Sequence, residues 1–127
     1  MTRQAISTAG APAALGPYSQ AIVSADLVFC AGQIGLDPAT GEIAEGVEAQ
    51  AERALRNLGA VLDAAGCSFA DVLKTTVFLS DINDFAAVNT VYARFVVDPA
   101  PARSTFAVGA LPKGALIEIE AIARRNA

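Results

Sequence analysis

The strongest constraint on the fold is a change of hydrophobic period near residue 47. From there the apolar residues recur at helical spacing on one stripe: Val47, Ala51, Ala54, Leu55, Leu58, Val61, Leu62 and Ala65. Glu52 and Arg56 form a favourable i,i+4 pair, and Gly66 is placed to end the helix. The flanking segments contain short runs rich in β-branched residues, which are typical of strands. The chain is therefore predicted to mix helices and strands in one fold.

Two strands are predicted before this helix. The runs Gln20–Ser24 and Leu27–Gln33 are rich in strand-forming residues and are separated by Ala25-Asp26, a plausible hairpin turn. Residues 35–46 contain the turn-forming sequence DPATGE and are predicted to form a loop. The first fifteen residues are interpreted as an arm with one short strand.

A third strand and a second helix are predicted to follow. Ser68 can cap a short turn before the strand Leu73–Leu79. The second helix is predicted over Asn83–Val96, with its buried face formed by Phe85, Val88, Tyr92 and Phe95. The sequence DPAP ends it, because proline cannot continue a helix.

The last part of the chain predicts two more strands, Arg103–Val108 and Ala115–Arg124, joined by a turn at 111–114. In the final strand Ile117, Ile119, Ala121 and Ala123 face one way, and Leu116, Glu118, Glu120 and Ile122 face the other. The order β-β-α-β-α-β-β predicts one α+β domain over residues 1–127, with both helices packed on one face of the sheet. The other face needs a cover, which another copy of the chain would provide.

Composition supports this subunit interface and excludes several classes of function. Hydrophobic residues make up 54% of the 127 residues and charged residues 17%, against about 25% charged in an average domain. The absence of histidine excludes Ser-His-Asp and Cys-His catalysis and histidine-ligated metal sites. A net charge of -4 without a basic block argues against nucleic-acid binding. No apolar run is long enough for a membrane helix, and the start lacks a signal core, so a cytoplasmic location is expected.

The remaining candidates for chemistry are carboxylates, arginine, tyrosine and thiols. Cys30 and Cys67 form no CxxC pair, and Cys30 is interpreted as a buried structural thiol. Arg103 follows a proline-stiffened loop and either binds a carboxylate or phosphate or forms a salt bridge. Glu118 and Glu120 share a strand face with apolar residues, where each is either a partly buried acid or exposed to solvent.

Two tyrosines and an asparagine complete this set. Tyr18 follows Gly16-Pro17 on a turn, whereas Tyr92 lies on a helix stripe and is interpreted as packing. Asn89 borders the buried face of the second helix, where it either contacts a ligand or satisfies a backbone group.

Long segments of the chain resemble one family. GPYSQAI, CAGQIGLDPATGEI, KTTVFLSDINDFAAVNTVY and PARSTFAVGALPKGALIEIEAIA, in this order, are similar to the reactive-intermediate deaminases (RidA, also called YjgF). The resemblance implies a chorismate-mutase-like fold assembled as a homotrimer, with a central barrel and ligand clefts between subunits. It also implies hydrolysis of 2-imino acids and enamines, such as 2-iminobutanoate and 2-iminopropanoate, to 2-oxo acids and ammonia without a cofactor.

The same resemblance assigns roles to particular residues. It implies that Arg103 binds the substrate carboxylate and that Glu118 positions or activates water. Tyr18, Gly32 and Asn89 match positions that line the ligand cleft. Thr105 stands at a substrate-contacting position where many members have cysteine, and activity is expected to survive this difference. The stretch before Arg103 is shorter than in several relatives, which leaves the preferred substrate size open.

Two other functions compete with imine hydrolysis. A non-catalytic carboxylate-binding or chaperone-like module would bind 2-oxo acids without turnover or suppress aggregation. An endoribonuclease is disfavoured by the acidic charge and by the absence of histidine.

Overall fold

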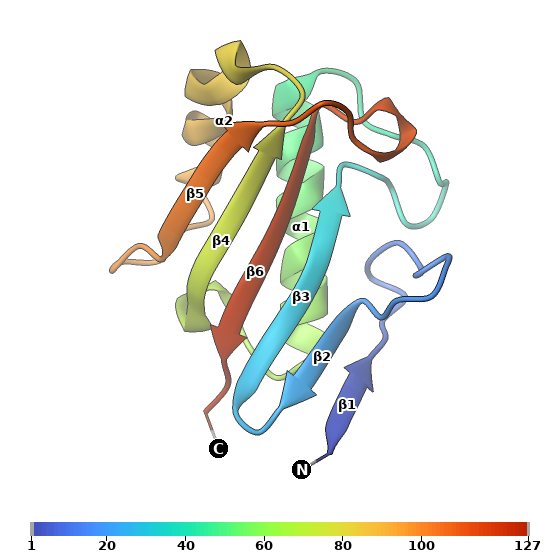
Figure 1. Ribbon diagram of the computed structural model, residues 1–127, viewed down its shortest axis with the longest axis vertical. Helices are drawn as coiled ribbons and strands as arrows, with labels where there is room; N and C mark the ends of the chain where they lie inside the picture. Colours follow the sequence, from blue (N-terminus) through green and yellow to red (C-terminus); the bar gives the residue numbers. More distant parts are fainter. Residues whose placement is uncertain (1, 127) are drawn as a thin grey trace.

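The computed structural model describes residues 2–126, which form a six-stranded sheet in the order β1-β2-β3-β6-β4-β5 (Figure 1). The ends of the predicted domain, residues 1 and 127, lie outside this description. Strands β4 and β5 run parallel, and all other neighbouring strands are antiparallel. The strands are β1 Arg3–Ile6, β2 Ala21–Ser24, β3 Leu27–Ile34, β4 Val72–Leu79, β5 Ala102–Ala107 and β6 Ile117–Arg124.

Two α-helices, α1 (Val47–Ala64) and α2 (Phe85–Tyr92), lie on the same side of this sheet, behind it in Figure 1. Three short 3-10 turns connect the elements: η1 Phe69–Asp71, η2 Ile82–Asp84 and η3 Pro112–Gly114. The predicted mixed α+β architecture with both helices on one face is therefore confirmed. Within residues 2–126 neither helix has the length and apolar content that crossing a bilayer requires.

Helix α1 ends where its sequence predicts. Gly66 has a φ of 82°, in the left-handed region that glycine adopts without steric cost. Its N–H donates to the carbonyl oxygen of Asp63 at 3.0 Å, and the N–H of Cys67 donates to that of Leu62 at 2.8 Å. These two bonds make a Schellman motif, which satisfies carbonyl groups that the end of the helix leaves free.

Strand β6 separates the core from the open face of the sheet. Its residues Ile117, Ile119, Ala121 and Ala123 are buried under the helices, as their alternation predicts. On the opposite face Phe29 and Phe106 remain 43% and 44% exposed, and Phe106 packs edge-on against Phe78 at 5.3 Å between ring centroids. Figure 1 is viewed from this face, and no described helix covers it. The single chain therefore leaves an apolar sheet face open.

The second helix is shorter than predicted. Instead of spanning Asn83–Val96, it follows a 3-10 turn and ends at Tyr92. The next amides donate to carbonyl groups three residues back, Arg94 to Val91 and Phe95 to Tyr92, and this tightens the chain into a turn. The chain must turn here because β5 runs parallel to β4, so the connection has to return to the end of the sheet where β4 starts.

Two further expectations need correction. Phe85 does not lie on the buried face, because its ring is 38% exposed and covers the guanidinium of Arg103 instead. The last strand begins at Ile117 and not at Ala115. The N–H of Leu116 donates to the side-chain oxygen of Gln50 on α1 at 2.8 Å and is therefore not available to a neighbouring strand. Its carbonyl oxygen accepts from the N–H of Ser80 at 3.1 Å.

Candidate active site

The residues assigned to a site by sequence fall into two groups on opposite faces of the sheet. Arg103 of β5 pairs with Thr75 of β4, which is 3% exposed beneath the helices. Glu118 of β6 pairs with Phe78, whose neighbours on either side face the helices. Because cross-strand partners share a face and successive residues alternate, Arg103 faces the helix layer and Glu118 faces the open side.

The first group lines a cavity of about 320 Å³, called here the Glu118 cleft. Tyr18, Gly32 and Glu118 all border it, together with the N-terminal arm and the turn η3. Its full lining is Pro12, Ala13, Leu15, Tyr18, Gln20, Gly32, Gln33, Ile34, Leu36, Pro112, Lys113 and Glu118. The cavity is large enough for a small organic molecule and is walled mainly by apolar side chains.

Glu118 is the carboxylic acid that lines this cleft. Its side chain is half-buried, and burial raises the pKa of its carboxyl, with a further rise from the charge of Glu120. The carboxyl lies against the backbone of Gly32, where a Cβ would overlap it. Glu120 itself is exposed. Of the two acids, Glu118 is the partly buried one, and its raised pKa favours it as a group that takes up and releases a proton.

Gln20 builds one wall of the Glu118 cleft and was not predicted as a site residue. Its side chain is 3% exposed. Its Oε1 accepts from the N–H of Thr8 at 2.7 Å, and its Nε2 donates to the carbonyl oxygens of Thr8 and Pro12 at 3.1 and 2.8 Å. This amide holds the N-terminal arm at Thr8 and Pro12, beside the cleft. A single glutamine ahead of a strand has no periodicity, so the sequence carries no signal for this role.

The second group surrounds Arg103 in an open groove, called here the Arg103 groove. Nη1 of Arg103 donates to Oδ1 of Asn89 at 2.8 Å. The guanidinium carbon lies 4.8 Å from the ring centroid of Tyr92 and 5.5 Å from that of Phe85. The groove is lined by Asn89, Tyr92, Ala93, Val96, Asp98, Ala100, Pro101 and Arg103.

Arg103 forms no salt bridge with a residue of the described chain, and a salt bridge across a subunit interface stays an untested alternative. The ion pairs found among residues 2–126 involve Arg56, Arg94 and Arg124, and none includes Arg103. Asn89 takes one N–H of the guanidinium, and the others have no acceptor in the described part of the protein. A guanidinium held this way, with donors left over, can bind a carboxylate by a bidentate pair.

Thr105 lies on the same face of β5 as Arg103, two residues along, and is paired with Val77. Its Oγ1 is buried and has no hydrogen-bond partner among residues 2–126. Buried hydroxyl groups are nearly always satisfied, so this one is free to accept or donate to a bound molecule. Its position beside Arg103 is compatible with the predicted substrate contact.

The two thiols do not contribute a nucleophile. Cys30 and Cys67 are both buried, which confirms the structural interpretation of Cys30. Burial raises the pKa of Cys30 to about 12 and also raises the pKa of Cys67. Both are therefore protonated at neutral pH, and only the thiolate form is reactive.

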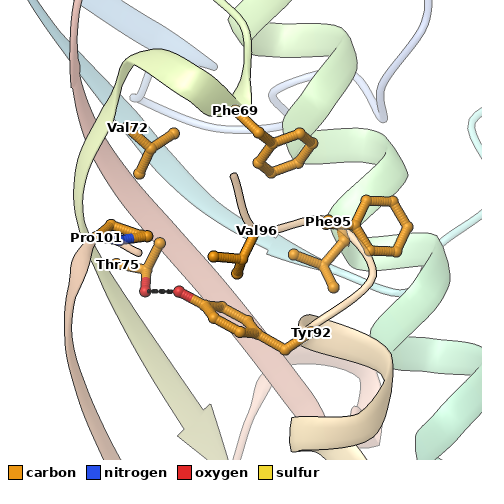
Figure 2. Close-up of a pocket in the computed structure, with 8 residues that line it drawn as sticks. Phe69, Val72, Thr75, Tyr92, Phe95, Val96 and Pro101 are labelled. Carbon is orange, nitrogen blue, oxygen red and sulfur yellow. Dashed lines mark hydrogen bonds between the residues drawn. The ribbon is translucent and has the colours of Figure 1, made fainter. Parts of the chain in front are cut away.

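Figure 2 shows a small apolar pocket that Tyr92 borders. It shares Tyr92, Val96 and Pro101 with the Arg103 groove. Its cavity of about 10 Å³ is close to the limit for one water molecule and cannot hold a substrate. Inside it the hydroxyl groups of Thr75 and Tyr92 are hydrogen-bonded at 2.6 Å. The pocket is therefore part of the support of the groove and no binding site of its own.

Comparison with known proteins assigns the family. The sequence model of the family described as Endoribonuclease L-PSP matches residues 8–125. The chain belongs to this family. A human 2-iminobutanoate/2-iminopropanoate deaminase is 51% identical over 124 residues, which cover 97% of this chain and 90% of the human protein. The resemblance to the RidA deaminases is thereby confirmed.

Two solved structures at more than 40% identity share the fold of this chain. RidA from the Antarctic bacterium Psychrobacter superposes with a TM-score of 0.93 at 47% identity and covers 95% of this chain and 98% of its own. E. coli TdcF, crystallised with bound serine, superposes with a TM-score of 0.92 at 44% identity, covering 97% of this chain and 99% of its own. The relatives of this chain thus include proteins named 2-iminobutanoate/2-iminopropanoate deaminase.

Proposed function

We propose that this protein hydrolyses 2-imino acids, such as 2-iminobutanoate and 2-iminopropanoate, and the enamines that tautomerise to them. The products are 2-oxo acids and ammonia. The observation that carries the proposal is Arg103, whose guanidinium is held by Asn89 and Tyr92 yet pairs with no described carboxylate. The 51% identity to a human enzyme named for this reaction supports the same assignment.

Arg103 serves as the anchor of the substrate carboxylate. Its unused N–H groups form a planar fork that matches two carboxylate oxygens. In a 2-imino acid the reactive carbon is bonded directly to the carboxylate carbon, so fixing the carboxylate also fixes the electrophile. This orientation replaces the random encounter of imine and water with a positioned one. Thr105 and Asn89 border the anchor and contact the same end of the substrate.

Glu118 serves as the proton-transfer group. Its carboxylate takes a proton from water while the water oxygen bonds to the carbon of the protonated imine, which gives a carbinolamine. The carboxylic acid then returns this proton to the nitrogen. Collapse of the carbinolamine forms the C=O bond and breaks the C–N bond, and the hydroxyl proton leaves with ammonia as ammonium. A raised pKa suits both steps, because the group must accept and donate near neutral pH.

These two roles require two copies of the chain. Arg103 and Glu118 border different cavities on opposite faces of one sheet, whereas the reacting carbon and the carboxylate of the substrate are directly bonded. One small substrate therefore reaches both groups only if the Arg103 groove of one subunit meets the Glu118 cleft of another. We propose a homotrimer with such shared clefts, in which the open sheet faces, with Phe29 and Phe106, form a central barrel. Tyr18 and Gly32 then line the Glu118 side.

A coupled assay tests the proposal. Threonine or serine dehydratase generates the imine, semicarbazide traps what remains, and the wild type is compared with Arg103→Ala and Glu118→Ala. Arg56→Ala is the matched control, because its ion pair with Glu52 lies on the exposed side of α1. The wild type and the control should lower the trapped imine, and the two site variants should not. Light scattering should give a mass near three chains, and a mass near one chain would refute the shared cleft.

The non-catalytic interpretation shares the Arg103 groove and differs in turnover. A carboxylate-binding module would bind 2-oxobutanoate and leave the trapped imine unchanged for both small and bulky imines. The family description names an endoribonuclease, but the net charge of -4 and the absence of histidine argue against that activity.

A further inference from the structure

We propose that Thr75 and Tyr92 form a positioning pair that fixes the guanidinium of Arg103 for carboxylate binding. The catalytic meaning of this pair rests on the proposed function, whereas its effect on the arginine can be measured independently. Neither residue touches the Glu118 cleft, and both act through Arg103. We therefore class them as positioning residues and not as catalytic ones.

The ring of Tyr92 is held at its outer end by one hydrogen bond. Its hydroxyl lies 2.6 Å from Oγ1 of Thr75, and both residues are buried, with 8% and 3% exposed. The other side chains around them in Figure 2 are apolar, including Phe95, Val96 and Pro101. Among residues 2–126 the two hydroxyl groups have only each other as partners, so the bond determines where the edge of the ring lies.

The held ring then places the guanidinium. Arg103 lies with its charged carbon 4.8 Å from the centroid of the Tyr92 ring, which attracts the cation. Asn89, one turn earlier on α2, accepts from Nη1 at 2.8 Å. Thr75 is also the β4 residue paired with Arg103 in the sheet. Thr75 thus contacts both parts of the arrangement: it pairs with Arg103 of β5 in the sheet and is hydrogen-bonded to Tyr92 of α2.

Packing alone does not require this hydroxyl pair. Valine and phenylalanine would fill nearly the same volume, and replacing both partners of a buried hydrogen bond by apolar groups is nearly neutral for stability. The pair instead makes the position of the ring specific. A carboxylate anchor benefits from this, because its two parallel hydrogen bonds form only when the guanidinium is aligned with both carboxylate oxygens.

The experiment compares Thr75→Val, Tyr92→Phe and their double variant with the wild type. Thr75→Ser keeps the hydroxyl and is the conservative variant. Thr90→Val is the control. This exposed residue of α2 has a hydroxyl that donates to the carbonyl oxygen of Ala86, so the variant also loses a hydroxyl hydrogen bond. For each protein we measure melting, the Kd of 2-oxobutanoate by calorimetry, and kcat and KM for 2-iminobutanoate. The ¹⁵N relaxation of Nε in Arg103 reports the order of its side chain directly.

We expect the Kd of 2-oxobutanoate and the KM to rise about tenfold in both single variants while kcat changes less, because the anchor acts in ground and transition states alike. The double variant should lose no more than either single one, because both remove one interaction. Nε of Arg103 should become more mobile in all three. Thr75→Ser and Thr90→Val should behave as the wild type.

Unchanged Kd and unchanged Nε order in Thr75→Val and Tyr92→Phe would overturn the positioning role. An equal loss in Thr90→Val, or no recovery in Thr75→Ser, would also overturn it, because the effect would then be general destabilisation. The proposed function fails separately, when the wild type neither binds 2-oxobutanoate nor hydrolyses the imine. In that case the Nε relaxation still decides whether the pair orders Arg103. Should Tyr92→Phe fail to fold, Thr75→Val and Thr75→Ser carry the same test.

Discussion

Gly32→Ala should separate the position of the Glu118 carboxyl from its presence. A Cβ built at Gly32 lies 2.7 Å from the carboxyl carbon of Glu118 and 2.9 Å from its Cγ. Carbon atoms in contact are normally about 3.5–4.0 Å apart, so the carboxyl must move by about 0.8 Å or more. The φ angle of Gly32 is not positive, so alanine at this position meets no backbone strain. The side chain of Glu118 can rotate away, and the protein should remain folded.

The magnitude follows from the displacement. A misplacement of about 1 Å at a reacting group lowers rates by about a hundredfold, so kcat of Gly32→Ala should fall by about 10- to 100-fold. The Kd of 2-oxobutanoate should change less, because Arg103 still holds the carboxylate. The dehydratase-coupled semicarbazide assay measures the rate, and calorimetry measures the binding.

Gly109→Ala is the matched control, because a Cβ at that glycine meets no atom within 4 Å and its φ is not positive. It should keep wild-type kcat and wild-type melting. A Gly32→Ala variant that is folded and retains wild-type kcat would refute the reasoning, since hydrolysis would then not depend on where the Glu118 carboxyl lies.

Three further predictions concern stability. Burial raises the pKa of Glu118 above its ordinary value of 4.5. The folded protein therefore holds the proton of this carboxyl more tightly than the unfolded chain does, and it loses stability as pH rises through the raised pKa. Glu118→Gln should therefore gain in melting temperature over the wild type as pH rises from 4 to 8; a constant difference would contradict this. Gln20→Ala should lower the free energy of unfolding by about 1–3 kcal/mol and raise the KM, because partly buried carbonyl groups of the arm lose their donor. Gly66→Ala should lower the free energy of unfolding, measured in urea, by about 1–2 kcal/mol, because alanine is strained at a φ of 82°.

The two helices differ in how well the sequence predicts them. Helix α1 has one long apolar stripe and a glycine at its end, and both are local properties of the chain. Helix α2 ends early because the following chain must reach the parallel strand β5, a requirement set by the sheet and not by the helix. For the same reason Phe85 covers Arg103 although its spacing matches a buried stripe.

The candidate site shows the same limit. The residue types of Arg103 and Glu118 allow an anion anchor and a partly buried acid, but they also allow a salt bridge and an exposed acid, and the resemblance to the family implies the specific roles. Their separation onto two sheet faces depends on the register of β4 with its two neighbours. Tyr92, interpreted as packing, is buried as predicted, but its ring also lies against the guanidinium of Arg103. Its hydroxyl is hydrogen-bonded to Thr75, which lies 17 residues earlier.

The sequence by itself determined the order of the main elements, the inward face of β6 and the end of α1, because helical and strand periods and capping residues act over a few neighbouring positions. It also determined the family, through long segments that resemble its members. Only the tertiary structure decided that Gln20 holds the arm, that Thr75 holds Tyr92, and that Arg103 and Glu118 border different cavities. These relations join residues far apart in the chain. They depend on which strands pair and in which register, and this is set by the packing of the whole core.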